Sequence, residues 1–77
     1  MKLTKGDVAH LTALMMGPAE FTDDEWIAMV TPLKEAGVLK SRVFCPVLIG
    51  RGMRNNRGDQ LYFVTDEAKR LVANWEE

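Results

Sequence analysis

The sequence predicts a small α+β domain in which two helices precede a two-stranded β-hairpin and a third helix follows it. Three observations lead to this expectation. Helix-start signals occur at Thr4, Thr22 and Thr65, two apolar stretches rich in β-branched and aromatic residues lie between the second and third signals, and a Gly/Asn/Arg-rich segment separates those stretches. With 77 residues, 47% of them hydrophobic, the chain suits one packed domain over residues 1–77.

The first helix is expected over residues 4–16. Thr4 is followed three residues later by Asp7, which is the spacing of an N-terminal capping box, and apolar residues then recur at helical intervals. Gly17 and Pro18 end the helix, since glycine favours a helix terminus and proline cannot continue one.

The second helix is expected over residues 22–36. Thr22 and Glu25 have capping-box spacing, and Gly37 can adopt the left-handed conformation that ends a helix. Pro32 lies inside this segment, where its ring removes a backbone donor and crowds the preceding turn. Either the helix kinks near Ala28, or it breaks and Thr31 caps a short new piece with Pro32 at its first position; both alternatives stay open.

The hairpin and the last helix occupy the second half of the chain. Enrichment in β-branched residues predicts a first strand over 38–49, with Pro46 restricting its pairing to one edge or a bulge. Residues 50–58 are rich in Gly, Asn and Arg and form the expected turn, and 59–64 return as the second strand. A capped helix with one apolar stripe is expected over 66–75.

Positive charge is concentrated in one part of a chain whose formal net charge is −1. The eighteen residues 40–57 hold five cations and no acid, whereas 1–39 and 58–77 each carry a net −3. Such a segment can produce a strong local field over a nearly neutral protein. The five cations are Lys40, Arg42, Arg51, Arg54 and Arg57. An ordinary solvated hairpin tip and a surface for a polyanion both account for this pattern, and both stay open.

Two stretches carry a resemblance to a known family. They are LKEAGVLKSR at residues 33–42 and LYFVTDEAKRL at residues 61–71. Together with the basic tip between them, they resemble the wing and the following helix of MarR-type and PadR-type winged-helix regulators, over residues 33–72. The resemblance implies a small winged-helix-like domain that acts as a DNA-binding protein or transcriptional regulator, as a homodimer.

In such a protein the wing would reach phosphates or the adjacent minor groove. The expected contact residues, for DNA or for an acidic partner, are Lys40, Arg42, Arg51, Arg54, Asn55, Asn56 and Arg57. A winged helix-turn-helix also places two helices between its first helix and the wing, and only residues 19–36 are available here.

The shortness of that region favours an alternative of a different class. On the same scaffold the chain would be a protein-binding module, such as a phage-encoded inhibitor or adaptor of a host protein, with no nucleic-acid binding. The arginines would then meet an acidic protein surface, or the apolar first strand would meet another protein. The residues expected in that second interface are Phe44, Pro46 and Leu48.

Other classes are not expected. Cys45 is the single cysteine, so no intramolecular disulfide or thiolate metal site is predicted, and without a signal peptide or apolar span we expect a cytoplasmic protein with no membrane partner. His10 is the single histidine and is expected on a helix surface or boundary. Trp26 and Trp75 are expected in the core. No catalytic motif appears, so we expect no enzyme activity and no cofactor.

Overall fold

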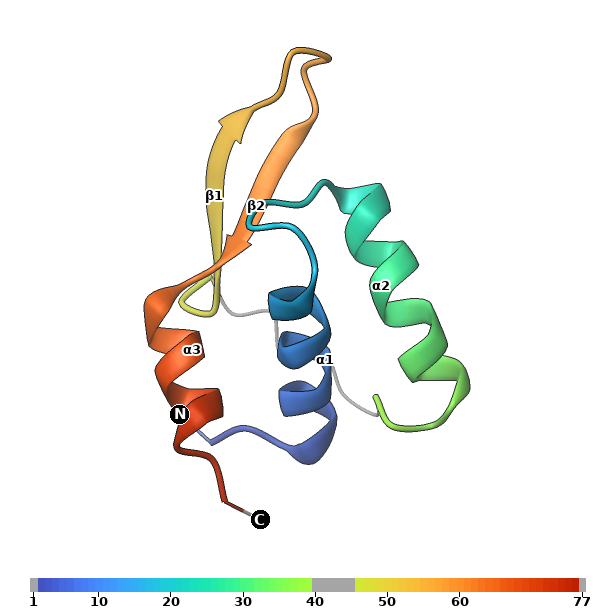
Figure 1. Cartoon of the computed structure of the whole chain (residues 1–77), viewed down its shortest axis with the longest axis vertical. Helices are drawn as coiled ribbons and strands as arrows, with labels where there is room; N and C mark the ends of the chain where they lie inside the picture. The colour runs from blue at the N-terminus through green and yellow to red at the C-terminus, as the bar shows by residue number, and fades with distance from the viewer. Residues whose placement is uncertain (1, 40–45, 77) are drawn as a thin grey trace.

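The computed structural model describes residues 2–39 and 46–76. Its elements are α1 (Lys5–Met16), α2 (Asp23–Glu35), β1 (Ile49–Arg54), β2 (Gln60–Val64) and α3 (Asp66–Ala73). This order confirms the predicted α+β arrangement of helix, helix, strand, strand, helix. In Figure 1, α1 lies between α2 and α3, and the β1–β2 hairpin extends away from them along the longest axis of the molecule, which measures 40 Å.

The predicted helix caps form as expected at the first two helices. The Thr4 hydroxyl accepts from the Asp7 backbone N–H at 3.2 Å, and the Asp7 carboxylate accepts from the Thr4 backbone N–H at 3.0 Å. At α2, the Thr22 hydroxyl accepts from the Glu25 N–H at 3.3 Å and donates to the Glu25 carboxylate at 3.2 Å. These local bonds satisfy backbone donors that a helix start otherwise leaves unpaired.

Helix α2 runs as one α-helix through Pro32, so the alternative in which the helix breaks there is wrong. The helix ends in the predicted glycine motif, with Gly37 at a φ of 73°. The N–H of Val38 donates to the carbonyl of Leu33 at 3.1 Å, and the N–H of Gly37 donates to that of Lys34 at 3.1 Å. Both bonds belong to a Schellman motif, which explains why the helix stops at this glycine.

The first strand begins later than predicted. Residues 46–48 form a turn, and β1 starts at Ile49 and continues through the segment expected to be the hairpin tip. Residues 40–45, also assigned to that strand, lie outside the described residues. Within the described part of this apolar run, Leu48 is 0% exposed although it sits in the turn, whereas Val47 beside it is 43% exposed.

The hairpin is antiparallel and irregular. Ile49 pairs with Val64 and Arg51 with Tyr62, but a bulge follows, in which two residues of β1 lie opposite one residue of β2 before the pairing resumes at Arg54. On the other edge of β2, Tyr62 exchanges two backbone hydrogen bonds with Phe21, at 2.8 and 2.9 Å. The segment between α1 and α2 therefore attaches the base of the hairpin to the helices.

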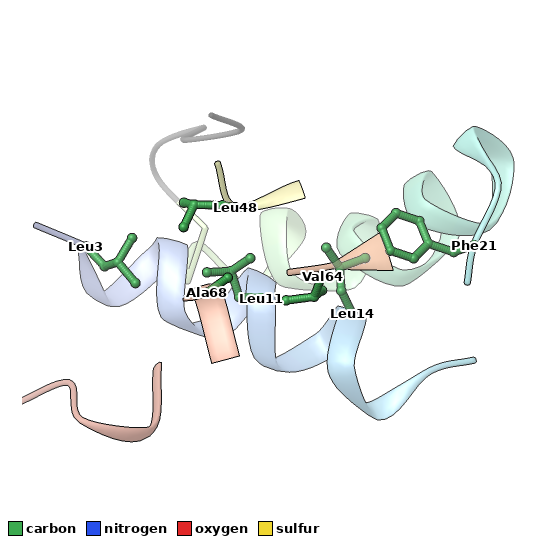
Figure 2. Packing of buried hydrophobic residues seen from close by; sticks show 7 residues of the cluster. All are labelled: Leu3, Leu11, Leu14, Phe21, Leu48, Val64 and Ala68. Carbon is green, nitrogen blue, oxygen red and sulfur yellow. The ribbon is translucent and has the colours of Figure 1, made fainter. Parts of the chain in front are cut away.

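The core lies between α1, α3 and the base of the hairpin. Figure 2 shows its buried side chains, which are Leu3, Leu11, Leu14, Phe21, Leu48, Val64 and Ala68. The predicted core placement of Trp26 and Trp75 is confirmed, since both pack against this cluster. The indole N–H of Trp75 also donates to the carbonyl of Leu3 at 3.0 Å, which ties the C-terminal segment to the N-terminal one.

The expected surface position of His10 is wrong, because this residue is 2% exposed. Its Nε2 accepts a hydrogen bond from the Trp26 indole N–H at 2.5 Å, and the two ring planes lie within 13° of parallel. A buried imidazole nitrogen needs a hydrogen-bond partner. Trp26 of α2 supplies this donor to His10 of α1.

Candidate nucleic-acid interface

Three arginines are distributed along the β1–β2 hairpin, from its base to its loop. We call residues 49–64, comprising β1, the connecting loop and β2, the arginine hairpin. Arg51 lies in β1, Arg54 ends it and Arg57 lies in the loop, and all three are exposed. Within residues 2–39 and 46–76, no carboxylate forms an ion pair with any of them. The hairpin that carries them extends from one end of the molecule (Figure 1).

The loop that carries Arg57 is held by its own side chains. The amide oxygen of Asn55 accepts from the backbone N–H groups of Arg57 and Asp59, both at 2.9 Å, and its amide nitrogen donates to the Asp59 carboxylate at 3.2 Å. The Arg54 guanidinium donates to the carbonyl of Gly58 at 3.0 Å. Gly58 has a φ of 83°, which a side chain would strain. Hydrogen bonds among the loop's own residues therefore hold its conformation.

Acidic residues lie close to the positive charge of the arginine hairpin. The hairpin holds three arginines and Asp59, for a net charge of +2. Because the whole chain has a formal net charge of −1, the residues outside the hairpin carry a net −3. The Glu20 carboxylate flanks β1, because one of its oxygens lies 3.6 Å from where a Cβ of Gly52 would stand. Acidic side chains therefore lie beside the strand as well as within the hairpin loop.

The predicted contact residues divide into three groups. Arg51, Arg54, Asn56 and Arg57 are brought together as exposed residues of the arginine hairpin. The Asn55 side chain makes hydrogen bonds within the loop, and its expected contact with a partner stays a prediction. Lys40 and Arg42 lie outside the described residues.

The expected apolar interface does not form as a unit. Leu48 is fully buried against α1 and α3, so its assignment to a protein-binding surface is wrong. Pro46 is exposed, and Phe44 lies outside the described residues. Figure 2 shows Leu48 within the same cluster as Leu11 of α1 and Ala68 of α3.

The helices are poorly suited to reading a DNA groove. Between α1 and the hairpin, α2 is the one helix in the part of the chain that the structure describes, whereas a helix-turn-helix uses two. Recognition helices present their first residues to the bases, but the first turn of α2 carries Asp23, Asp24 and Glu25. Three carboxylates at that position repel phosphates, so the arginine hairpin is the better candidate for contact.

The positions of two residues on this surface had no signal in the sequence. Met53 lies at the bulge of β1 and is 85% exposed, although a methionine in an apolar-flanked hairpin is usually part of a core. Glu20 approaches β1 only because Phe21 pairs with β2. Both placements arise from contacts between segments distant in the sequence.

Other kinds of site are not apparent in the described segments. No three His, Cys, Asp or Glu side chains come together there as a metal site would require. A cleft of about 520 Å³ separates the N-terminal segment from α3, but Lys2, Arg70, Glu67 and Glu76 line it with both signs of charge. Among residues 2–39 and 46–76, no helix has the length and apolar character needed to span a bilayer.

Comparisons with known proteins do not assign a family. No family model matches this chain, and no curated protein or solved structure shows significant similarity to it. The resemblance to winged-helix regulators therefore stays a prediction.

Proposed function

We propose that this protein binds double-stranded DNA through the arginine hairpin and acts as a small DNA-binding or regulatory protein. The observation that supports this most directly is the set of three exposed guanidinium groups, unpaired with carboxylates in the described part of the chain, on a projecting hairpin. Guanidinium groups bind phosphate oxygens in a bidentate geometry, and DNA presents those oxygens at regular spacing along each strand.

The organised loop favours binding further. A loop that is already ordered by Asn55 and by the Arg54–Gly58 hydrogen bond loses little conformational freedom when it meets DNA. Arginines on a projecting two-stranded ribbon can also reach the phosphates and the adjacent minor groove, where basic side chains are attracted. Recognition would depend mainly on the DNA backbone.

Three phosphate contacts per chain correspond to a log–log salt slope of about −2.7, or a loss of about 40-fold in affinity between 50 and 200 mM salt. In a homodimer, which we propose as the binding form, the slope doubles to about −5.4 because both hairpins engage the same duplex. The slope therefore reports how many hairpins bind.

The experiment compares two variants with the same change in net charge. Arg51→Ala/Arg57→Ala removes two exposed arginines of the hairpin, and Lys69→Ala/Arg70→Ala removes two exposed cations of α3. Each protein is titrated against a random-sequence duplex between 50 and 200 mM salt. We expect the hairpin variant to reduce the magnitude of the slope by about 1.8 for each bound chain, which is about 3.6 for the homodimer, while the α3 variant leaves the slope close to that of the wild type. Equal losses in the two variants would contradict a localised interface.

A second candidate function keeps the same surface but not the DNA. The acidic first turn of α2 and the single helix between α1 and the hairpin favour a protein-binding module whose arginines meet an acidic protein surface. The two functions differ in the titration above. A wild-type protein that binds no duplex at 50 mM salt would exclude the DNA-binding function and favour the protein-binding one.

A further inference from the structure

Met53 is an apolar side chain in an unusual position. It is 85% exposed, although methionine is among the residues most often buried, and it belongs to the arginine hairpin. The bulge of β1 places Gly52 and Met53 together opposite Leu61, so β1 carries one more residue than β2 at this point. A bulge of this kind re-aims the side chains beside it.

The surroundings of Met53 are cationic. Arg54 is its neighbour in the chain, and Arg51 precedes it by two residues, which is about 7 Å along an extended strand. The arginine hairpin therefore presents one unbranched apolar side chain between two groups that bind phosphate. Behind it the loop is fixed by the hydrogen bonds of Asn55, so the side chain is carried on an ordered support.

We propose that Met53 is a wedge that inserts between two base pairs when the arginine hairpin binds DNA, so that the protein selects DNA whose base stack is interrupted or easily opened. This inference rests on the proposed DNA-binding function. Proteins that kink a duplex insert apolar side chains of this size, methionine included, while flanking arginines hold the backbone. The methionine side chain suits the task because it is flexible, thin and polarisable.

The proposal specifies the preferred DNA. Separating two stacked base pairs costs free energy, least at pyrimidine–purine steps and least of all where unpaired nucleotides already interrupt the stack. The protein should therefore prefer a duplex with a two-nucleotide bulge over an intact duplex of the same length. We expect the preference to be about tenfold, since most of the unstacking cost is already met in the bulged duplex.

The test uses two DNA duplexes of equal length, one intact and one with a two-nucleotide bulge, each with 2-aminopurine beside the central step as a reporter of unstacking. The full chain is compared with Met53→Ala and with Met16→Ala. Met16 is a matched control, because it is 84% exposed but lies at the end of α1. Thermal unfolding verifies that both variants keep the fold, which removal of an exposed side chain should not disturb.

The expected result is that the wild type and Met16→Ala prefer the bulged duplex and raise 2-aminopurine fluorescence in the intact one. Met53→Ala should bind both duplexes with similar affinity and leave the fluorescence unchanged, while its salt slope persists. Met53→Leu, which keeps an apolar side chain of similar volume, should restore much of the preference.

Three outcomes would overturn the inference. If Met53→Ala retains the full preference, Met53 is not the wedge. If the wild type binds both duplexes equally, DNA binding stands and the wedge alone fails. If the wild type binds neither duplex at 50 mM salt, the proposed function fails together with the wedge. In that case, vesicles of phosphatidylcholine and phosphatidylserine test a different ligand: binding that is lost in Met53→Ala would assign this side chain to a lipid surface.

Discussion

The indole N–H of Trp26 donates to Nε2 of His10, at 2.5 Å, and so joins α2 to α1 through the single histidine of the chain. For Nε2 to accept this bond, the imidazole must be the neutral tautomer that carries its proton on Nδ1. Figure 1 shows the two helices side by side, with α2 on the outer side of α1. The pair therefore couples the placement of α2 to a specific, directional contact in addition to apolar packing.

Replacement of Trp26 by Phe should destabilise the protein by about 1–3 kcal/mol, because a buried acceptor loses its donor. Equilibrium urea unfolding, followed by circular dichroism, measures this loss. The double variant His10→Leu/Trp26→Phe removes both partners of the bond, so its destabilisation should be smaller than the sum of the two single effects. Strict additivity would show that the hydrogen bond contributes little.

The ring of Phe63 lies across Gly50, its partner in the opposite strand, so that a Cβ on Gly50 would come within 2.8 Å of Phe63 Cε2. Gly50→Ala should therefore destabilise the hairpin by about 1–3 kcal/mol, because the aromatic ring must move. Gly52→Ala is the matched control: its Cβ would lie 3.6 Å or more from its neighbours, an ordinary contact distance. Gly50→Ala should therefore lower the unfolding temperature more than Gly52→Ala does. Equal changes in the unfolding temperature would contradict the packing of Phe63 on Gly50.

Pro32 lies within a continuous helix and lacks the N–H that would bond to the carbonyl four residues before it. Pro32→Ala restores this donor, and we expect it to raise the free energy of unfolding by about 1–3 kcal/mol. Urea unfolding provides the value. Pro32 lies in α2 and outside the arginine hairpin, so the substitution should leave DNA affinity unchanged, which a parallel titration checks. A destabilised variant would mean that the proline ring contributes packing that outweighs the missing bond.

Glu20 places a carboxylate beside β1 without pairing with the hairpin arginines in the described structure. If the arginine hairpin binds DNA, Glu20→Gln should increase affinity about two- to threefold at 50 mM salt, and the gain should shrink at 200 mM as the charges are screened. Glu67→Gln, on α3, makes the same change in net charge away from the hairpin. A similar gain in both variants would indicate a long-range effect of net charge instead.

Sequence reasoning was most successful where the determinants are local. The caps at Thr4 and Thr22, the end of α2 at Gly37 and the order of the elements were all predicted correctly. Each depends on residues within one or two helical turns, where hydroxyl-to-amide bonds and the positive φ of glycine act over a few ångströms. The concentration of arginines was likewise visible in the chain, and the structure places those of the hairpin together and exposed.

Tertiary contacts decided the features that the sequence left undetermined or indicated wrongly. The first strand begins at Ile49, where pairing with Val64 begins, His10 is buried against Trp26, and Leu48 is buried in the core cluster. Composition determined that this protein has a small core, capped helices and a basic segment. Only the fold determined which apolar residues enter the core and that Met53 does not, because burial depends on partners that the chain brings together from distant positions.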